Sequence, residues 1–116
     1  MTVERISKEE LKAKLDRGED VVLVEALGEG RYDEAHLPGA INIPHDRVDE
    51  LAPKLLPDKG AQIVVYCSNG PCRNSGIASD RLARLGYEDV RDYHEGKQDW
   101  MEAGLPTESG AVWAGG

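Results

Sequence analysis

The sequence predicts a single α/β domain with a mostly parallel central sheet of about five strands and helices on both faces. Short β-branched runs alternate with segments of helical period along the whole chain, as in folds built from repeated βαβ units. The runs at 21–24 and 62–66 are continuously apolar, which is typical of parallel strands covered on both faces. The 116 residues are enough for one domain, which we place at 1–106, before a Gly-rich tail at 107–116.

Each predicted element has a local pattern behind it. In chain order we expect a strand at 4–6, a helix at 8–17, a strand at 21–24, a helical turn at 32–35, a strand at 40–43, a helix at 48–55, a strand at 62–66, a helix at 75–85, a strand at 89–93 and a helix at 97–103.

In the first half of the chain, capping and turn residues set the limits of the elements. Ser7 and Glu10 form a capping box that starts the first helix, and Gly18 ends it. Prolines enclose the third strand, with Pro38 before it and Pro44 after it. The helix that follows has apolar residues at helical spacing and ends before a further proline.

In the second half, one long segment of helical period follows the most apolar strand. We expect its buried side to carry Ile77, Ala78, Leu82 and Leu85, with Gly86 as the stop. The last helix is expected to pack Trp100 inward.

Charge and composition narrow the classes of partner. Fourteen Lys and Arg against 22 Asp and Glu give a net charge of −8, which disfavours nucleic acid and anionic membranes as partners. No apolar stretch is long enough to span a membrane, and the first residues do not read as a signal peptide, so we expect a cytoplasmic protein. Two cysteines five positions apart cannot staple a fold, and no second Cys or His pair has zinc-ligand spacing, so no metal is expected.

Cys67 stands where the most apolar strand ends and a helix follows after a short polar loop. Ligands of parallel α/β sheets bind at such strand ends. We expect the backbone amides of the loop to form an anion-binding nest there, with a gap at Pro71; the donors are Ser68, Asn69, Gly70, Cys72 and Arg73. The nest and the helix dipole would depress the pKa of the Cys67 thiol and make it a nucleophile. The alternative is a cysteine that is simply a small buried apolar residue.

Three stretches together resemble the single-domain rhodaneses over residues 3–106. They are the strand 21–24 with the run 32–44, the run 63–67 with Gly70, and the closing run 95–106. The resemblance implies a rhodanese-like fold and sulfur transfer without a cofactor. Cys67 would take the outer sulfur of thiosulfate or a persulfide, become a persulfide, and pass the sulfur to cyanide, a thiol or an acceptor protein.

The loop departs from the family in length. The family's usual loop has a basic or polar residue five positions after the cysteine; here Cys72 stands there and Arg73 follows. Cys-x5-Arg resembles the rhodanese-like phosphatases and arsenate reductases, in which Arg73 would grip an oxyanion. Tyr66 stands where those phosphatases usually have histidine, so sulfur transfer is preferred. A non-catalytic interaction module of the same fold is the third possibility.

The resemblance and the positions in the chain predict roles for three further residues. Glu25 and Leu27 stand where the family usually has an Asp and an Arg, and Glu25 is expected to accept hydrogen bonds from loop amides. His94 ends the last strand and is expected near the mouth of the site. Cys72 either resolves a Cys67 persulfide or sulfenate into a disulfide or points into the protein.

Overall fold

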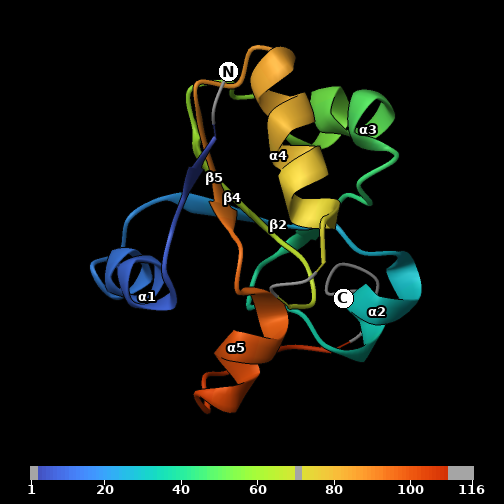
Figure 1. The fold of residues 1–116 in the computed structure, drawn as a ribbon. Coiled ribbons are helices and arrows are strands. Elements are labelled where there is room, and N and C mark those ends of the chain that lie inside the picture. The colour runs from blue at the N-terminus through green and yellow to red at the C-terminus, as the bar shows by residue number, and fades with distance from the viewer. Residues whose placement is uncertain (1–2, 70–71, 110–116) are drawn as a thin grey trace.

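The computed structural model of the protein describes residues 3–69 and 72–109 and contains a five-stranded sheet with five helices there (Figure 1). The elements are β1 (Glu4–Arg5), α1 (Lys8–Asp16), β2 (Val21–Glu25), α2 (Glu29–Glu34), β3 (Ile41–Asn42), α3 (Val48–Leu55), β4 (Gln62–Tyr66), α4 (Asn74–Arg84), β5 (Asp89–Tyr93) and α5 (Gly96–Glu102). The strand order is β1-β5-β4-β2-β3 and every pairing is parallel, which confirms the predicted sheet.

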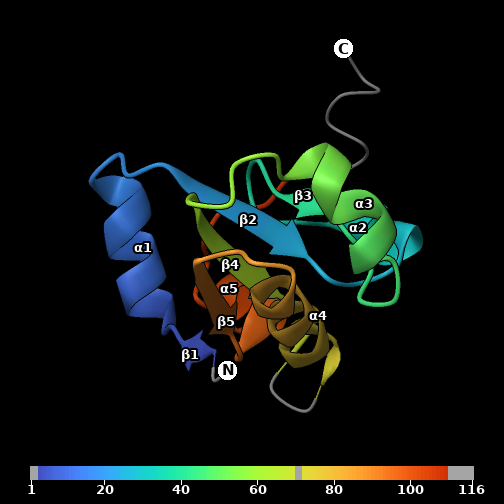
Figure 2. The ribbon, with the colours of Figure 1, turned by 90° about the horizontal axis from the view of Figure 1, so that it is seen from above.

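Helices cover both faces of the sheet, as predicted (Figure 2). Side chains of a strand alternate between the two faces. In β4, Ile63 and Val65 pack with α3 and α4, whereas Val64 and Tyr66 pack with α1 and α5. Because β4 lies in the middle of the sheet, both faces of this strand are buried.

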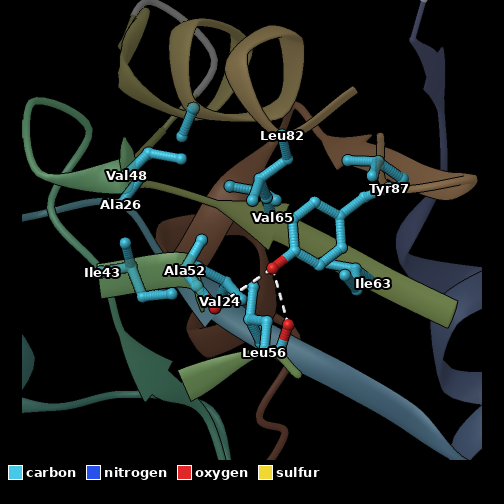
Figure 3. Packing of buried hydrophobic residues seen from close by; sticks show 12 residues of the cluster. Val24, Ala26, Ile43, Val48, Ala52, Leu56, Ile63, Val65, Leu82 and Tyr87 are labelled. Carbon is cyan, nitrogen blue, oxygen red and sulfur yellow. Dashed lines mark hydrogen bonds between the residues drawn. The ribbon is translucent and has the colours of Figure 1, made fainter. Parts of the chain in front are cut away.

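Tyr87 ties one of these two core clusters together (Figure 3). Its ring packs among aliphatic side chains, and its hydroxyl donates to the carbonyl oxygens of Ala52 at 3.1 Å and Leu56 at 2.6 Å. These carbonyls belong to the last turn of α3 and to its C-cap, and the Ala52 carbonyl also accepts from the Leu56 amide at 2.8 Å. The hydroxyl therefore fixes the end of α3 against the sheet.

Most predicted elements appear in the structure with small differences at their ends. The capping box is confirmed: the Ser7 hydroxyl accepts from the Glu10 amide at 3.1 Å, and the Ser7 amide donates to the Glu10 carboxylate at 3.3 Å. Strand β2 continues to Glu25, which pairs with β3 and β4. Helix α2 begins at Glu29, three residues before the predicted turn, because the backbone of Gly28 provides its N-cap.

One prediction about α4 is wrong. Ile77 is half exposed rather than buried. The face on the sheet carries Ser75, Ala78, Ser79 and Leu82, at the i, i+3, i+4 and i+7 positions of one helix face. Trp100, in contrast, is buried in α5 as predicted.

The segment after α5 returns to the body of the domain. Glu108 exchanges two backbone hydrogen bonds of 2.8 Å with His36, and its carboxylate accepts from the Gly39 amide at 2.9 Å. These contacts reach beyond the boundary expected at residue 106. Gly70, Pro71 and Trp113 lie outside the described residues. In the part of the chain that is described, no helix has the length and apolar character needed to cross a bilayer.

Candidate active site

Cys67 directly follows the central strand β4, and α4 begins at Asn74 a short loop later. The thiol therefore lies at the carboxyl edge of the parallel sheet and beside a helix N-terminus, as the sequence predicts. Tyr66 before the loop and Ser75 in the first turn of α4 after it are both fully buried, so both ends of the loop are fixed.

The Cys67 thiol is fully buried, and three oxygen atoms lie within hydrogen-bond distance of its sulfur. Its Sγ lies 3.6 Å from the Ser75 hydroxyl oxygen, 3.6 Å from the Cys72 carbonyl oxygen and 4.0 Å from the Asn69 carbonyl oxygen. Burial, followed by the hydrogen bond to the Cys72 sulfur, raises the pKa of Cys67 to about 11. The predicted depression of this pKa is thus wrong, because burial of the thiol and its hydrogen bond to Cys72 outweigh the hydroxyl and amide of Ser75, which act in the opposite direction.

Cys72 is half-buried, and one of the amides expected around Cys67, that of Ser68, donates to the Cys72 sulfur instead. Burial disfavours its thiolate, but hydrogen bonds from the Cys67 thiol and from the Asn74 and Ser68 amides outweigh burial and lower the pKa of Cys72. Its own amide donates to the Asn69 carbonyl at 3.1 Å and closes a turn, so this amide is not part of an open nest. The structure therefore brings Cys67 and Cys72 together.

The first turn of α5 braces the cysteine loop from outside. The Lys97 amide donates to the Cys67 carbonyl at 2.8 Å, and the Gln98 amide donates to the Ser68 carbonyl at 2.7 Å. Gly96 has a φ of +78°, and a Cβ there would lie 2.7 Å from the Cys67 carbonyl oxygen. Only glycine allows the two backbones to approach this closely.

Glu25 forms a buried charged cluster one layer below the loop. Its carboxylate accepts two bonds from the Lys97 ammonium, at 3.1 and 3.2 Å, and one from the Tyr66 hydroxyl at 2.8 Å. Burial raises the pKa of Glu25, while the charge of Lys97 and the Tyr66 hydroxyl act in the opposite direction. Among the described residues, the expected loop amides are not partners of Glu25, because Lys97 and Tyr66 occupy its oxygens.

Sequence reasoning missed three residues of this site. Ser75 contacts the Cys67 sulfur, Gly96 makes room for the loop, and Lys97 supplies the cation that Leu27 cannot. Lys97 is 72 positions from Glu25 in the chain, so no local pattern joins them. The available signal was the Gly-Lys pair within the closing run at 95–106.

A shallow surface pocket contains three of the predicted site residues. Cys72, Arg73 and His94 line it, together with Arg5 and Asp92. Arg73 is exposed there, so its guanidinium lies on the rim rather than in the buried layer that holds Cys67. Residues 3–69 and 72–109 contain no cluster of His, Cys, Asp or Glu that could hold a metal ion.

Comparison with known proteins shows the family to which the whole chain is similar. A family model described as "Rhodanese-like domain" matches residues 7–103. The chain is 40% identical over 62 residues to thiosulfate sulfurtransferase PspE of Escherichia coli, covering 53% of this chain and 58% of that protein. It is 37% identical over 107 residues to the HTH-type transcriptional regulator Rv0324 of Mycobacterium tuberculosis, covering 91% of this chain and 45% of the regulator.

The chain thus spans about half the length of these curated relatives. Among solved structures, the BH2092 protein of Bacillus halodurans superposes with a TM-score of 0.83 at 24% identity, over 91% of this chain and 77% of the other. That likeness concerns the fold alone.

Proposed function

The chain belongs to the rhodanese family, and from that premise we propose that it is a sulfurtransferase or sulfur carrier that forms a persulfide on Cys67. The observation that carries the proposal is the position of this thiol at the end of the central strand, beside the N-terminus of α4 and braced by α5. The name of the relative PspE supports thiosulfate as one donor, and a small persulfide is the other donor class.

The first half-reaction loads one sulfur atom onto the protein. The Cys67 thiol loses its proton, and its sulfur attacks the outer sulfur of thiosulfate. A bond forms between these two sulfurs while the S–S bond of thiosulfate breaks, and sulfite leaves with the electron pair. Because the Ser68 and Asn74 amides point at the Cys72 sulfur, an anionic donor has to displace Cys72 to reach them.

The second half-reaction removes the sulfur atom from Cys67. Cyanide, a thiol or an acceptor protein attacks the outer sulfur of the persulfide, and the Cys67 thiolate leaves. Two α5 amides hold the Cys67 and Ser68 carbonyls, so this end of the loop stays braced while Cys72 is displaced.

The test compares the protein with its Cys67→Ser variant. Thiosulfate and cyanide are supplied together, and thiocyanate is measured; we expect formation that the variant lacks. A chromogenic phosphate ester in a parallel assay tests the oxyanion alternative, which the exposed position of Arg73 supports less well. If no persulfide forms on Cys67 by mass spectrometry and neither activity depends on it, both enzymatic functions are wrong.

The likeness to a transcriptional regulator supports a second candidate function. In that case the domain is a non-catalytic module that responds to sulfur species within a larger protein. A persulfide that forms on Cys67 but is not passed to cyanide or a thiol would favour this candidate over an enzyme.

A further inference from the structure

Two thiols meet inside the cysteine loop in a geometry that the sulfur-transfer cycle above does not use. The Cys67 Sγ lies 3.6 Å from the Cys72 carbonyl oxygen, and its thiol donates to the Cys72 sulfur. The turn that places Cys72 there is closed by its own amide on the Asn69 carbonyl at 3.1 Å. The two cysteine side chains therefore lie within hydrogen-bond reach of each other beyond the end of β4.

The donors around Cys72 are those that stabilise a sulfur anion. The Ser68 and Asn74 amides face its sulfur, and the Ser68 hydroxyl also donates to it. Cys67 has the Asn69 and Cys72 carbonyl oxygens near its sulfur, and only Ser75 acts on it as a donor that favours the thiolate. A thiolate is the nucleophile in thiol–disulfide chemistry. Of the two residues, Cys72 is thus the better placed to attack its neighbour.

We propose that Cys72 attacks the persulfide of Cys67, releases the sulfane sulfur as hydrosulfide and leaves a Cys67–Cys72 disulfide. This inference rests on the function proposed above, because it needs a persulfide on Cys67. A bond forms between the Cys72 sulfur and the Cys67 Sγ, and the bond from that Sγ to the outer sulfur breaks. The outer sulfur leaves with the electron pair and its proton, so it is reduced while the Cys72 sulfur is oxidised.

The choice of the inner sulfur as the point of attack follows from the leaving groups. Attack on the outer sulfur would expel the Cys67 thiolate, whereas attack on Sγ expels hydrosulfide. Hydrogen sulfide is a stronger acid than an ordinary thiol, and burial makes the Cys67 thiol weaker still. Since the sulfur with the lower pKa leaves faster, hydrosulfide is the better leaving group.

The cycle closes with a dithiol reductant. Such a dithiol attacks the disulfide, becomes a disulfide itself and returns Cys67 and Cys72 to thiols. Cys72 is the one of the two that reaches the surface, where it lines the pocket with Arg73 and His94. The overall activity is therefore dithiol-dependent reduction of sulfane sulfur to hydrosulfide, with the exposed Cys72 as the point of entry for the reductant.

The test follows the fate of one loaded sulfur atom. The reduced protein, Cys72→Ser and Cys67→Ser are each loaded with thiosulfate, freed of excess and followed by intact mass and a hydrosulfide assay. In the unaltered protein we expect the persulfide to give way to a disulfide with stoichiometric hydrosulfide. In Cys72→Ser the persulfide should persist at least about 100-fold longer, because an intramolecular thiol acts at a high effective concentration.

Three results separate the inference from the function beneath it. A persulfide equally long-lived in the unaltered protein and in Cys72→Ser overturns the role of Cys72 but leaves sulfur transfer intact. Persulfide found on Cys72 by peptide mapping also overturns it, because the outer sulfur would then be the point of attack. If no variant loads sulfur, the proposed function and this inference fall together. Cys72→Ala, with circular dichroism of both variants, provides the control for folding.

Discussion

The two cysteines of the loop differ in the surroundings of their sulfurs, and this difference should determine which of them reacts first with an alkylating agent. Burial raises the pKa of Cys67 to about 11, whereas hydrogen-bond donors lower the pKa of Cys72 despite its burial. Each unit by which a thiol pKa rises removes about tenfold of its thiolate near neutral pH. Brief alkylation with iodoacetamide near neutral pH should therefore modify Cys72 first, with Cys67 reacting as the pH approaches its own pKa.

Peptide mapping at a series of pH values measures this order. In Cys72→Ser the sulfur that accepts from Cys67 is gone, so the pH at which Cys67 begins to react should move downward. Preferential alkylation of Cys67 near neutral pH would contradict the arrangement of donors described for the loop.

The ion pair of Glu25 and Lys97 is the second feature that depends on single residues. The Glu25 carboxylate is fully buried, and the Lys97 side chain is only 11% exposed. Lys97→Met should lower the free energy of unfolding by about 3–5 kcal/mol, because it leaves a buried carboxylate without its cation. Urea denaturation measures the change, and the double variant Glu25→Gln/Lys97→Met should recover much of it.

The pH dependence of the stability loss in Lys97→Met tests whether the contact between Glu25 and Lys97 is ionic. Burial raises the pKa of Glu25, and without Lys97 it rises further. A carboxyl whose pKa is raised on folding stabilises the fold fully below its unfolded pKa and loses that contribution as the pH rises through the folded pKa. The deficit of Lys97→Met should thus shrink in acid and grow toward neutral pH. A deficit independent of pH would mean that the lost contact is not ionic.

At the scale of elements, α5 holds the cysteine loop through the close approach at Gly96. Gly96 and Gly104 both have positive φ, +78° and +75°, so alanine at either position costs roughly 1–2 kcal/mol of backbone strain. A Cβ at Gly104 meets nothing within 4 Å, whereas at Gly96 it meets three loop atoms within 2.9 Å. Gly96→Ala should therefore be the less stable variant, by roughly a further 1–3 kcal/mol, and should also lose thiocyanate formation.

Gly104→Ala is the matched control because it shares the strain but not the contact. Thermal melting and the thiocyanate assay on both variants separate the two effects. Equal losses of activity in the two variants would show that backbone strain, and not displacement of the loop, is responsible.

How far the sequence predicts the elements depends on how local their causes are. Continuous apolar runs, the capping box at Ser7 and the glycine stops act within a few residues, so they could be predicted. Glu25 could not be recognised as the last residue of β2, because its buried carboxylate is stabilised by Lys97 from the far end of the chain. The raised pKa of Cys67 was missed for the same reason, since the burial of its thiol and the approach of Cys72 depend on how the loop packs.

At the scale of the whole molecule, the segment after α5 packs against the loop that precedes β3. Glu108 pairs with the backbone of buried His36 and accepts from the Gly39 amide. A chain that ends at Thr107 should be less stable than one that ends at Ser109 by roughly 1–3 kcal/mol, because the His36 backbone loses its hydrogen-bond partners. Chemical denaturation of the two truncated chains measures the difference, and equal stabilities would show that the bridge contributes nothing.

The order of the strands also has a consequence for encounters between copies of the protein. The two outermost strands, β1 and β3, have two residues each, and the three longer strands lie between them. Intermolecular sheet growth needs a long row of unpaired backbone groups at an edge, and here that row is nearly absent. Both residues of β1 are charged and exposed, and the net charge of −8 repels a second copy. The fold thereby guards a sheet of apolar parallel strands against fibril formation.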